Sequence, residues 1–183
     1  SGLGVIPRVV ANGRAIYRGK IAMQEAEQRL SHYWQPYHQT LQNVLTRAHR
    51  HFGRAVLIDC HSMPHEAIET MAARGPHAPE VVLGDRFGST ASPEVMDQVE
   101  AAFASAGLQV SRNAPFAGAY ITQAYGRPAR HQHAIQVEID RSLYMDEARI
   151  RPNGNFKGLQ QVLRGVVAEI AGIGSAELPL AAE

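Results

Sequence analysis

The sequence has one cysteine, no long apolar run and almost no excess of charge. Cys60 is the only cysteine among 183 residues, so the chain cannot form an internal disulfide bond. Neither a signal-peptide pattern nor an apolar stretch of the ~20 residues that a membrane-spanning helix requires is present. The 18 basic residues are balanced by 17 acidic ones, which indicates no surface for nucleic acid or for an anionic membrane. We therefore expect a cytoplasmic enzyme or binding domain, with no nucleic acid and no membrane as partner.

The pattern of apolar residues predicts strands that alternate with helices. Continuous apolar runs, typical of strands covered on both faces, occupy residues 55–58 and 81–83. Helical spacing, with proline in the first turn of two segments, predicts helices at about 23–33, 36–52, 93–106 and from about 155 onward. This alternation favours an α/β fold, a three-layer sandwich around a mixed, largely parallel sheet. At this length we expect a single domain over residues 1–183.

Two longer segments lack a regular period. Residues 61–80 are rich in proline and polar residues, and they predict a loop with a short helical turn. Residues 113–134 carry three aromatic residues together with glycines and prolines, which is typical of a substrate loop or lid. Tyr120 and Tyr125 in this second segment could donate hydrogen bonds to a substrate or simply pack the loop down.

The stretch VLIDCHSMPH, residues 56–65, ends a predicted strand in a carboxylate, a thiol and an imidazole. In open α/β sheets, ligands sit at the carboxyl ends of the strands. A neutral His61 there could bind zinc, with Asp59 orienting the ring, or it could be a hydrogen-bonded histidine in a turn. Cys60 falls on the opposite face of the strand, and we predict it to be a buried packing residue.

Glu138 lies in a predicted strand, residues 134–140, that alternates between apolar and polar residues. A carboxylate that faces the interior is costly unless it serves a metal, a proton transfer or a cation. The alternative is an edge strand whose polar face meets solvent. Glu138 is therefore a candidate catalytic residue only if its strand lies inside the sheet.

Several other polar residues follow predicted strands. Arg86 and Asn113 lie where substrate-holding groups are commonly placed, although turn chemistry explains these residue types as well. Arg141 could clamp an anion or cover the surface. A metal pair of His61 and His65 on one helical face is doubtful, because Pro64 lies between them.

Six stretches of the sequence carry a family resemblance, and in order they are GLGVIPRVV, QPYH, LIDCHSMPH, GDRFG, NAPFAGAYITQAYGRP and HAIQVEIDRSLYMDE. Together they resemble the N-formylglutamate amidohydrolase (N-formylglutamate deformylase) family. The resemblance implies a zinc-carboxypeptidase-like fold, also described as phosphorylase/hydrolase-like. It covers nearly the whole chain.

The resemblance also implies an activity, namely hydrolysis of N-formyl-L-glutamate to formate and L-glutamate in histidine degradation, with Zn(2+) as cofactor. The family's Asp-x-His-Ser segment places a zinc ligand at His61, and its Gln-x-Glu segment places the general base at Glu138. We expect Arg86 and Asn113 to hold the carboxylates of this small N-acyl amino acid substrate, with Tyr120 as a further contact.

Zinc sites of this fold take two more ligands, a histidine and an acidic residue, from a region that precedes the first residue of this sequence. A catalytic zinc has three protein ligands and an open position, so His61 alone is an incomplete set. We therefore expect the chain to lack an N-terminal part and to be inactive by itself. The alternatives are a carboxypeptidase-like hydrolase of another N-acyl amino acid or a peptide, and a catalytically incomplete binding domain.

Overall fold

The computed structural model describes residues 4–10, 13–72 and 78–173. The chain divides into two compact units, residues 1–44 and residues 45–183. The expectation of one domain over the whole chain stays a prediction. Within the described ranges, no helix is both long enough and apolar enough to cross a bilayer.

The chain is helical without a break from residue 23 to residue 52. It forms α1 (Met23–Arg29), a π-helical turn (Leu30–Trp34) and α2 (Gln35–Phe52) in direct succession. The sequence predicted a new helix at Pro36, and the structure has a wide π turn just before that residue instead. Proline has no backbone N–H to donate, and the π turn allows the helical path to continue through Pro36.

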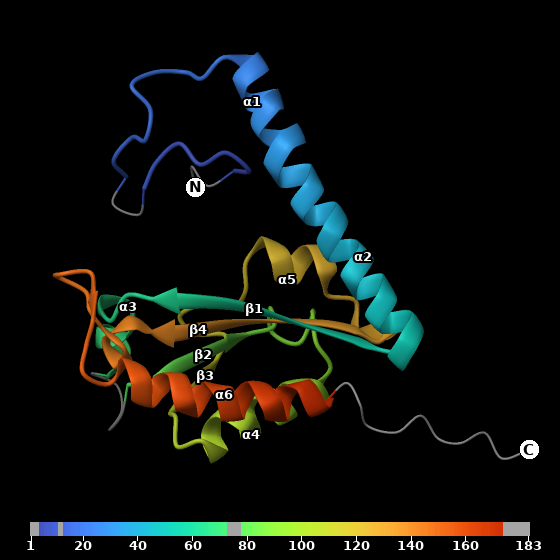
Figure 1. The fold of residues 1–183 in the computed structure, drawn as a ribbon, viewed down its shortest axis with the longest axis vertical. Helices are drawn as coiled ribbons and strands as arrows, with labels where there is room; N and C mark the ends of the chain where they lie inside the picture. The colour runs from blue at the N-terminus through green and yellow to red at the C-terminus, as the bar shows by residue number, and fades with distance from the viewer. Residues whose placement is uncertain (1–3, 11–12, 73–77, 174–183) are drawn as a thin grey trace, which may run out of the picture. The chain divides into compact units, whose positions relative to one another are not determined.

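The second unit is built on a mixed four-stranded sheet (Figure 1). Its strands are β1 (Ala55–Met63), β2 (Val81–Gly84), β3 (Val110–Arg112) and β4 (Gln132–Asp140), in the spatial order β1-β4-β2-β3. β1 is parallel to β4 and β2 is parallel to β3, whereas β2 and β4 are antiparallel. The predicted mixed, largely parallel sheet is therefore confirmed.

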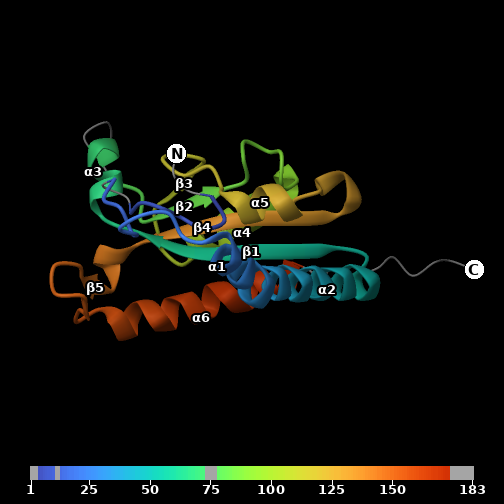
Figure 2. The same cartoon turned by 90° about the horizontal axis from the view of Figure 1, so that it is seen from above.

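Helices cover both faces of this sheet, so the predicted layered α/β arrangement is confirmed as well. α4 (Pro93–Ser105) and α6 (Phe156–Ile173) pack on one face against Ile135 and Val137 of β4. α5 (Tyr120–Tyr125) lies on the other face, and Figure 2 shows it over β4. The polar side chains of β4 alternate with the apolar ones and therefore point toward the α5 face.

A smaller core lies on the α5 face, near the carboxyl end of β1. It consists of Met63, Ile68 and Val82, all fully or almost fully buried. Ile68 belongs to α3 (Glu66–Ala72), the short helix predicted within residues 61–80. This core holds α3 against the end of the sheet where the polar side chains gather.

Some elements were not predicted from the sequence. α5 lies inside residues 113–134, where a loop was expected, and β1 continues five residues past its predicted end. The chain after β4 forms a two-stranded ribbon of β5 (Met145–Asp146) and β6 (Arg151–Pro152). Two short 3-10 helices, Pro128–Arg130 and Arg141–Leu143, flank β4.

Gly84, the last residue of β2, is crossed closely by the segment that leads into α5. A Cβ atom at this position would stand 2.6 Å from the backbone C of Ala117 and 2.6 Å from the backbone N of Gly118. Real Cβ atoms do not approach backbone so closely, and backbone cannot move aside as a flexible side chain can. Gly84 therefore allows residues 117–119 to lie directly on the sheet.

We predict that Gly84→Ala destabilises the protein by about 1–3 kcal/mol, the usual cost of overpacking. Gly165→Ala is the matched control, because Gly165 is an exposed residue of α6 whose added Cβ would meet nothing within 4 Å. The control should stabilise α6 by about 0.5–1 kcal/mol through helix propensity. Thermal unfolding of the wild type and the two variants checks the predicted loss of stability in Gly84→Ala and the predicted gain in Gly165→Ala. An unchanged melting temperature in Gly84→Ala would contradict the close approach.

Candidate active site

His61 on β1 and Glu138 on β4 lie side by side on the sheet. The parallel register pairs His61 with Glu138, and Asp59 with Gln136. Neighbouring strands are about 4.8 Å apart, and paired residues point to the same face. Four polar side chains therefore gather on the face that carries α5. The sequence had singled out three of them, and it had not indicated that their two strands are neighbours.

The carboxylate of Asp59 faces the imidazole of His61. Oδ2 of Asp59 lies 3.0 Å from Nε2 of His61. The two groups are in close contact, although the contact lacks hydrogen-bond geometry. Asp59 thus lies where an orienting carboxylate is needed beside a metal-binding histidine. The role itself stays a prediction.

The donor atoms on this face fit part of a zinc site. Oδ2 of Asp59 is buried, and it has no hydrogen bond of good geometry to any described residue. A buried orphaned carboxylate oxygen is costly in free energy, and a nearby cation would offset that cost. Yet in the part of the chain that the structure describes, no three His, Cys, Asp or Glu side chains stand close enough to hold a metal ion. His61 could therefore serve as one ligand of a set that these residues do not complete.

Glu138 is a buried carboxylate inside the sheet. β4 lies between β1 and β2, and Glu138 is only 8% exposed, so the alternative of a solvated edge strand is wrong. Burial raises the pKa of Glu138 above its ordinary value, while His61, the Gln136 amide and Arg141 oppose the shift by stabilising the charged form. A carboxylate with a raised pKa is a better proton acceptor near neutral pH than an exposed glutamate.

Arg141 ties together the ends of β1 and β4. Its Nε donates to Oγ of Ser62 over 3.2 Å, and its Nη2 donates to the backbone oxygen of Ser62 over 3.0 Å. The guanidinium is half-buried and helps to hold the Glu138 carboxylate in its charged form. Covering the surface was one of the two roles predicted for Arg141. Its hydrogen bonds show that it does more than that.

Asn113 clamps the turn that carries Arg86. Arg86 and Phe87 have φ angles of 54° and 56°, values that residues other than glycine seldom adopt. Oδ1 of Asn113 accepts hydrogen bonds from the backbone N–H groups of Asp85 and Phe87, and its Nδ2 donates to Oδ1 of Asp85. Asn113 thus acts on the backbone around Arg86, and its contact with a substrate stays a prediction.

Arg86 and Tyr120 flank the segment that crosses the sheet into α5. Nη1 of Arg86 donates to the backbone oxygen of Gly118 over 3.3 Å, and the side chain is half-buried. Tyr120, the first residue of α5, is 53% exposed. The backbone just before Tyr120 lies on the polar face, because the N–H of Ala119 donates to Gln136. The predicted contacts of Arg86 and Tyr120 with a substrate stay predictions.

Cys60 is exposed, so its predicted role as a buried packing residue is wrong. The sequence placed it on the face of β1 opposite His61, and strand alternation supports that placement. Its exposure has a different cause, because β1 is one of the two edge strands of the described sheet and lies partly uncovered. An apolar run alone cannot distinguish a central strand from an outer one.

His65 joins a second polar cluster instead of pairing with His61. β1 runs as a strand to Met63, so the two histidines share no helix. Nδ1 of His65 lies 2.8 Å from Oδ2 of the buried Asp140, which also accepts a 2.8 Å hydrogen bond from Oγ of Ser142. Sequence reasoning missed Asp140, although its place two residues after Glu138 on the polar face was a usable signal.

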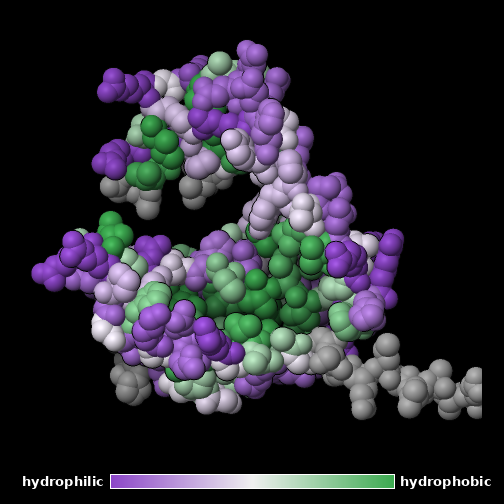
Figure 3. Space-filling model, viewed as in Figure 1, coloured by the Kyte–Doolittle hydropathy of each residue, from purple (hydrophilic) through white to green (hydrophobic). Residues whose placement is uncertain are grey.

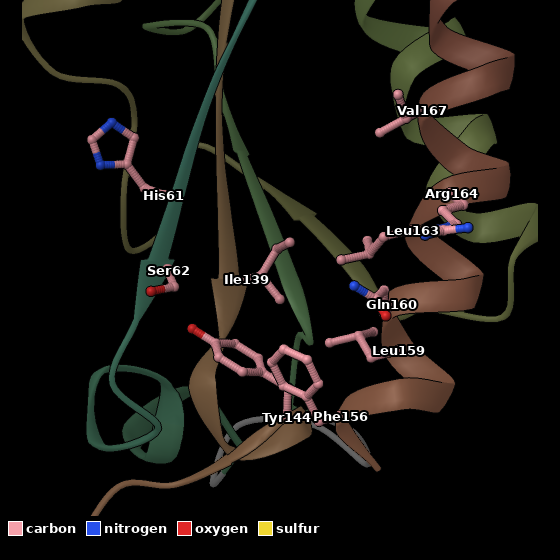
Figure 4. Close-up of a pocket in the computed structure, with 10 residues that line it drawn as sticks. All are labelled: His61, Ser62, Ile139, Tyr144, Phe156, Leu159, Gln160, Leu163, Arg164 and Val167. Atoms are coloured by element: carbon pink, nitrogen blue, oxygen red, sulfur yellow. The ribbon is translucent and has the colours of Figure 1, made fainter. Parts of the chain in front are cut away.

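A cavity of about 530 Å³ lies on the other face of the sheet, beside α6. Apolar side chains such as Ile139, Leu163 and Val167 line it, and Figure 3 shows hydrophobic residues gathered on the surface of this unit. In Figure 4 the His61 imidazole projects from β1 on the side away from these residues. His61 borders this cavity as well, together with Ser62, Tyr144 and Arg164. Because Asp59, Gln136 and Glu138 share the other face of the sheet, we place the candidate active site on the α5 face.

Comparison with known proteins identifies the family. The profile of the N-formylglutamate amidohydrolase family matches residues 1–145, which include both His61 and Glu138. The chain belongs to this family. The resemblance read from the six sequence motifs is therefore confirmed.

Individual members of the N-formylglutamate amidohydrolase family match over most of the chain. An N-formylglutamate deformylase of Pseudomonas aeruginosa is 34% identical over 171 residues, which are 91% of this chain and 62% of the relative. One of Pseudomonas putida is 32% identical over 147 residues, 79% of this chain and 54% of the relative. The crystal structure of N-formylglutamate amidohydrolase from Ralstonia eutropha matches with a TM-score of 0.80 at 32% identity.

The match to the Ralstonia eutropha structure covers 95% of this chain and 61% of that chain. The chain therefore spans less than two thirds of the length of each of these relatives. With a TM-score of 0.80 over this coverage, the α/β fold class agrees with a solved family member.

We predict that the imidazole of His65 titrates above its ordinary pKa. The hydrogen bond to the Asp140 carboxylate is the main cause. Burial, the next largest effect, opposes it, and the charges of Asp140, Glu69 and Glu147 add to the rise. Because the folded-state pKa is raised, the stabilisation from this pair is fully present below the ordinary imidazole pKa and is lost as the pH rises through the raised value.

NMR titration of the histidine resonances measures this shift, with His65→Gln to assign the signal. Asp140→Asn should return the pKa of His65 toward its ordinary value. Glu147→Gln is the matched control, since Glu147 contributes only a weaker charge effect, and it should move the pKa far less. Equal shifts in the two variants would contradict the assignment.

Proposed function

We propose that the protein is a zinc-dependent amidohydrolase that hydrolyses N-formyl-L-glutamate to formate and L-glutamate, in the cytoplasm and as part of histidine degradation. The observation that carries the proposal is a buried carboxylate, Glu138, beside a metal-ligand candidate, His61, on one sheet face. Relatives named N-formylglutamate deformylase support the choice of substrate. Since the chain spans only part of their length, the proposal concerns the complete gene product.

Glu138 acts as the general base. Its carboxylate takes a proton from the attacking water as the new C–O bond forms at the formyl carbon. When the C–N bond breaks, the same proton passes from Glu138 to the departing amine nitrogen of glutamate. The half-buried Arg141 favours the charged form of Glu138 at the start of this cycle.

His61 would hold the metal through a ring nitrogen, and the Asp59 carboxylate, 3.0 Å from Nε2, would lie beside the ring. When bound, zinc supplies Lewis-acid chemistry, since it lowers the pKa of a water molecule and polarises a carbonyl group. A catalytic zinc has three protein ligands, so the proposal requires two more than the described residues bring together.

The two carboxylates of N-formyl-L-glutamate call for cationic and amide donors. Arg86 is the first candidate, because the Asn113 clamp holds its backbone in an uncommon conformation and its guanidinium lies over the segment leading into α5. Uncommon backbone conformations persist where the surrounding structure enforces them, often at binding sites. Tyr120 and Asn113 would complete the substrate side of the site.

We expect His61→Ala in the complete gene product to lose both bound zinc and deformylase activity, because the variant lacks a metal ligand. Cys60→Ala is the matched control, since it alters the neighbouring residue on the opposite face of the same strand. The control should keep full activity and metal content. Metal analysis and a formate-release assay check the outcome, and full activity of His61→Ala or of the chelated wild type would contradict zinc dependence.

Glu138→Gln should keep zinc and lower kcat by about 10²- to 10⁴-fold, the usual contribution of a general base. Glu169→Gln, which neutralises an exposed carboxylate on α6, should leave kcat unchanged. Steady-state kinetics with N-formyl-L-glutamate measures both variants. Unimpaired turnover by Glu138→Gln would show that another group is the base.

Substrate profiling tests the choice of substrate separately from the mechanism. We expect the highest kcat/KM with N-formyl-L-glutamate, and much lower values with N-acetylglutamate, with a formylated neutral amino acid and with peptides. A preference for one of these other compounds would indicate a different hydrolase on the same fold. A lack of turnover with all of them would favour a binding domain.

A further inference from the structure

Gln136 lies two residues before Glu138 on the same strand and the same face. Its side chain is only 4% exposed and makes two hydrogen bonds. Oε1 of Gln136 accepts from the backbone N–H of Ala119 over 2.8 Å, and Nε2 donates to Oε1 of Glu138 over 2.8 Å. A single buried amide thus connects the candidate base to the segment that leads into α5.

The chemistry of these neighbours fixes the orientation of the Gln136 amide. A backbone N–H can only donate, so the oxygen of Gln136 must face Ala119 and the nitrogen must face Glu138. The reversed amide would set donor against donor at Ala119 and acceptor against acceptor at the charged Glu138. Oε1 of Glu138 is therefore held as a hydrogen-bond acceptor.

We propose that Gln136 is a positioning residue of the active site, which fixes the Glu138 carboxylate and reserves its Oε2 for proton transfer. This inference rests on the proposed role of Glu138 as the general base. An acceptor bond at Oε1 leaves Oε2 as the oxygen that exchanges the proton with water and with the departing amine. Gln136 itself touches no substrate in this scheme.

The same amide links Glu138 to the substrate side of the site. The peptide group between Gly118 and Ala119 donates its N–H to Gln136, and its carbonyl oxygen accepts from Nη1 of Arg86 over 3.3 Å. Hydrogen bonds that share a peptide group polarise one another. The positions of Arg86 and Glu138 are therefore set through one peptide group and one side-chain amide.

The close packing around this peptide leaves it little freedom. A Cβ at Gly84 would meet the backbone of Ala117 and Gly118 at 2.6 Å, and one at Gly118 would meet Oγ1 of Thr122 at 2.6 Å. Ala119 has a φ of −102°, which an alanine adopts without strain. The N–H of Ala119 is thus aimed at Gln136 by rigid surroundings, as a positioning contact requires.

Gln136→Met in the complete gene product tests the proposal, because methionine keeps the shape and loses both hydrogen bonds. We expect kcat for N-formyl-L-glutamate to fall by about 10- to 100-fold, as misplacement of a catalytic group does, with a much smaller change in KM. Gln136→Glu keeps the acceptor for Ala119 and loses the donor to Glu138 when ionised, so its kcat should fall as well. Hydrogen exchange of the Ala119 amide should increase in the methionine variant only.

Gln132→Met is the matched control. Gln132 lies on the same strand, and its amide donates to the backbone oxygen of Tyr125 over 2.6 Å, at the far end of α5. The control should lose a similar amount of thermal stability and keep its kcat. Normal kcat in both Gln136 variants, or an equal loss of kcat in Gln132→Met, would overturn the positioning role. An inactive wild-type gene product would instead overturn the proposed function, and the positioning role with it.

Discussion

The parallel pairing of β1 and β4 is the interaction on which the site depends. These strands are separated by about 70 residues of chain, and their register alone brings His61 beside Glu138 and Asp59 beside Gln136. A shift by one residue would turn every polar side chain of one strand to the other face, which is the apolar core under α4 and α6. The same register thus protects the core and assembles the candidate site.

The buried Glu138 carboxylate shows what the surrounding residues must supply. Burying a carboxylate costs several kcal/mol, and a hydrogen bond to a charged group returns only about 1.5–3 kcal/mol. The Gln136 bond does not act alone, because His61 and Arg141 also favour the charged form of Glu138. Because the cost of burial outweighs these favourable interactions, the pKa of Glu138 stays above its ordinary value. A raised pKa suits a base that operates near neutral pH.

Local sequence patterns predicted the features that depend on local chemistry. The alternation in residues 134–140 correctly separated the core face of β4 from its polar face, and Pro93 marked the start of α4. Features set by distant contacts were missed. The exposure of Cys60 follows from the outer position of β1, and the six-residue α5 is held through Gln132 and Gln136 of β4, not by a helical repeat of its own. The role of Asn113 in the turn depends on its hydrogen bond to Asp85, a residue distant from it in the sequence.

The most direct test is an anomalous diffraction map of the complete gene product at the zinc absorption edge. The central claim is that His61, oriented by Asp59, holds the metal next to Glu138. The map should then show a zinc peak about 2.1 Å from a ring nitrogen of His61, on the sheet face that carries α5. A catalytically active crystal with zinc bound elsewhere, or with no metal at His61, would contradict the account.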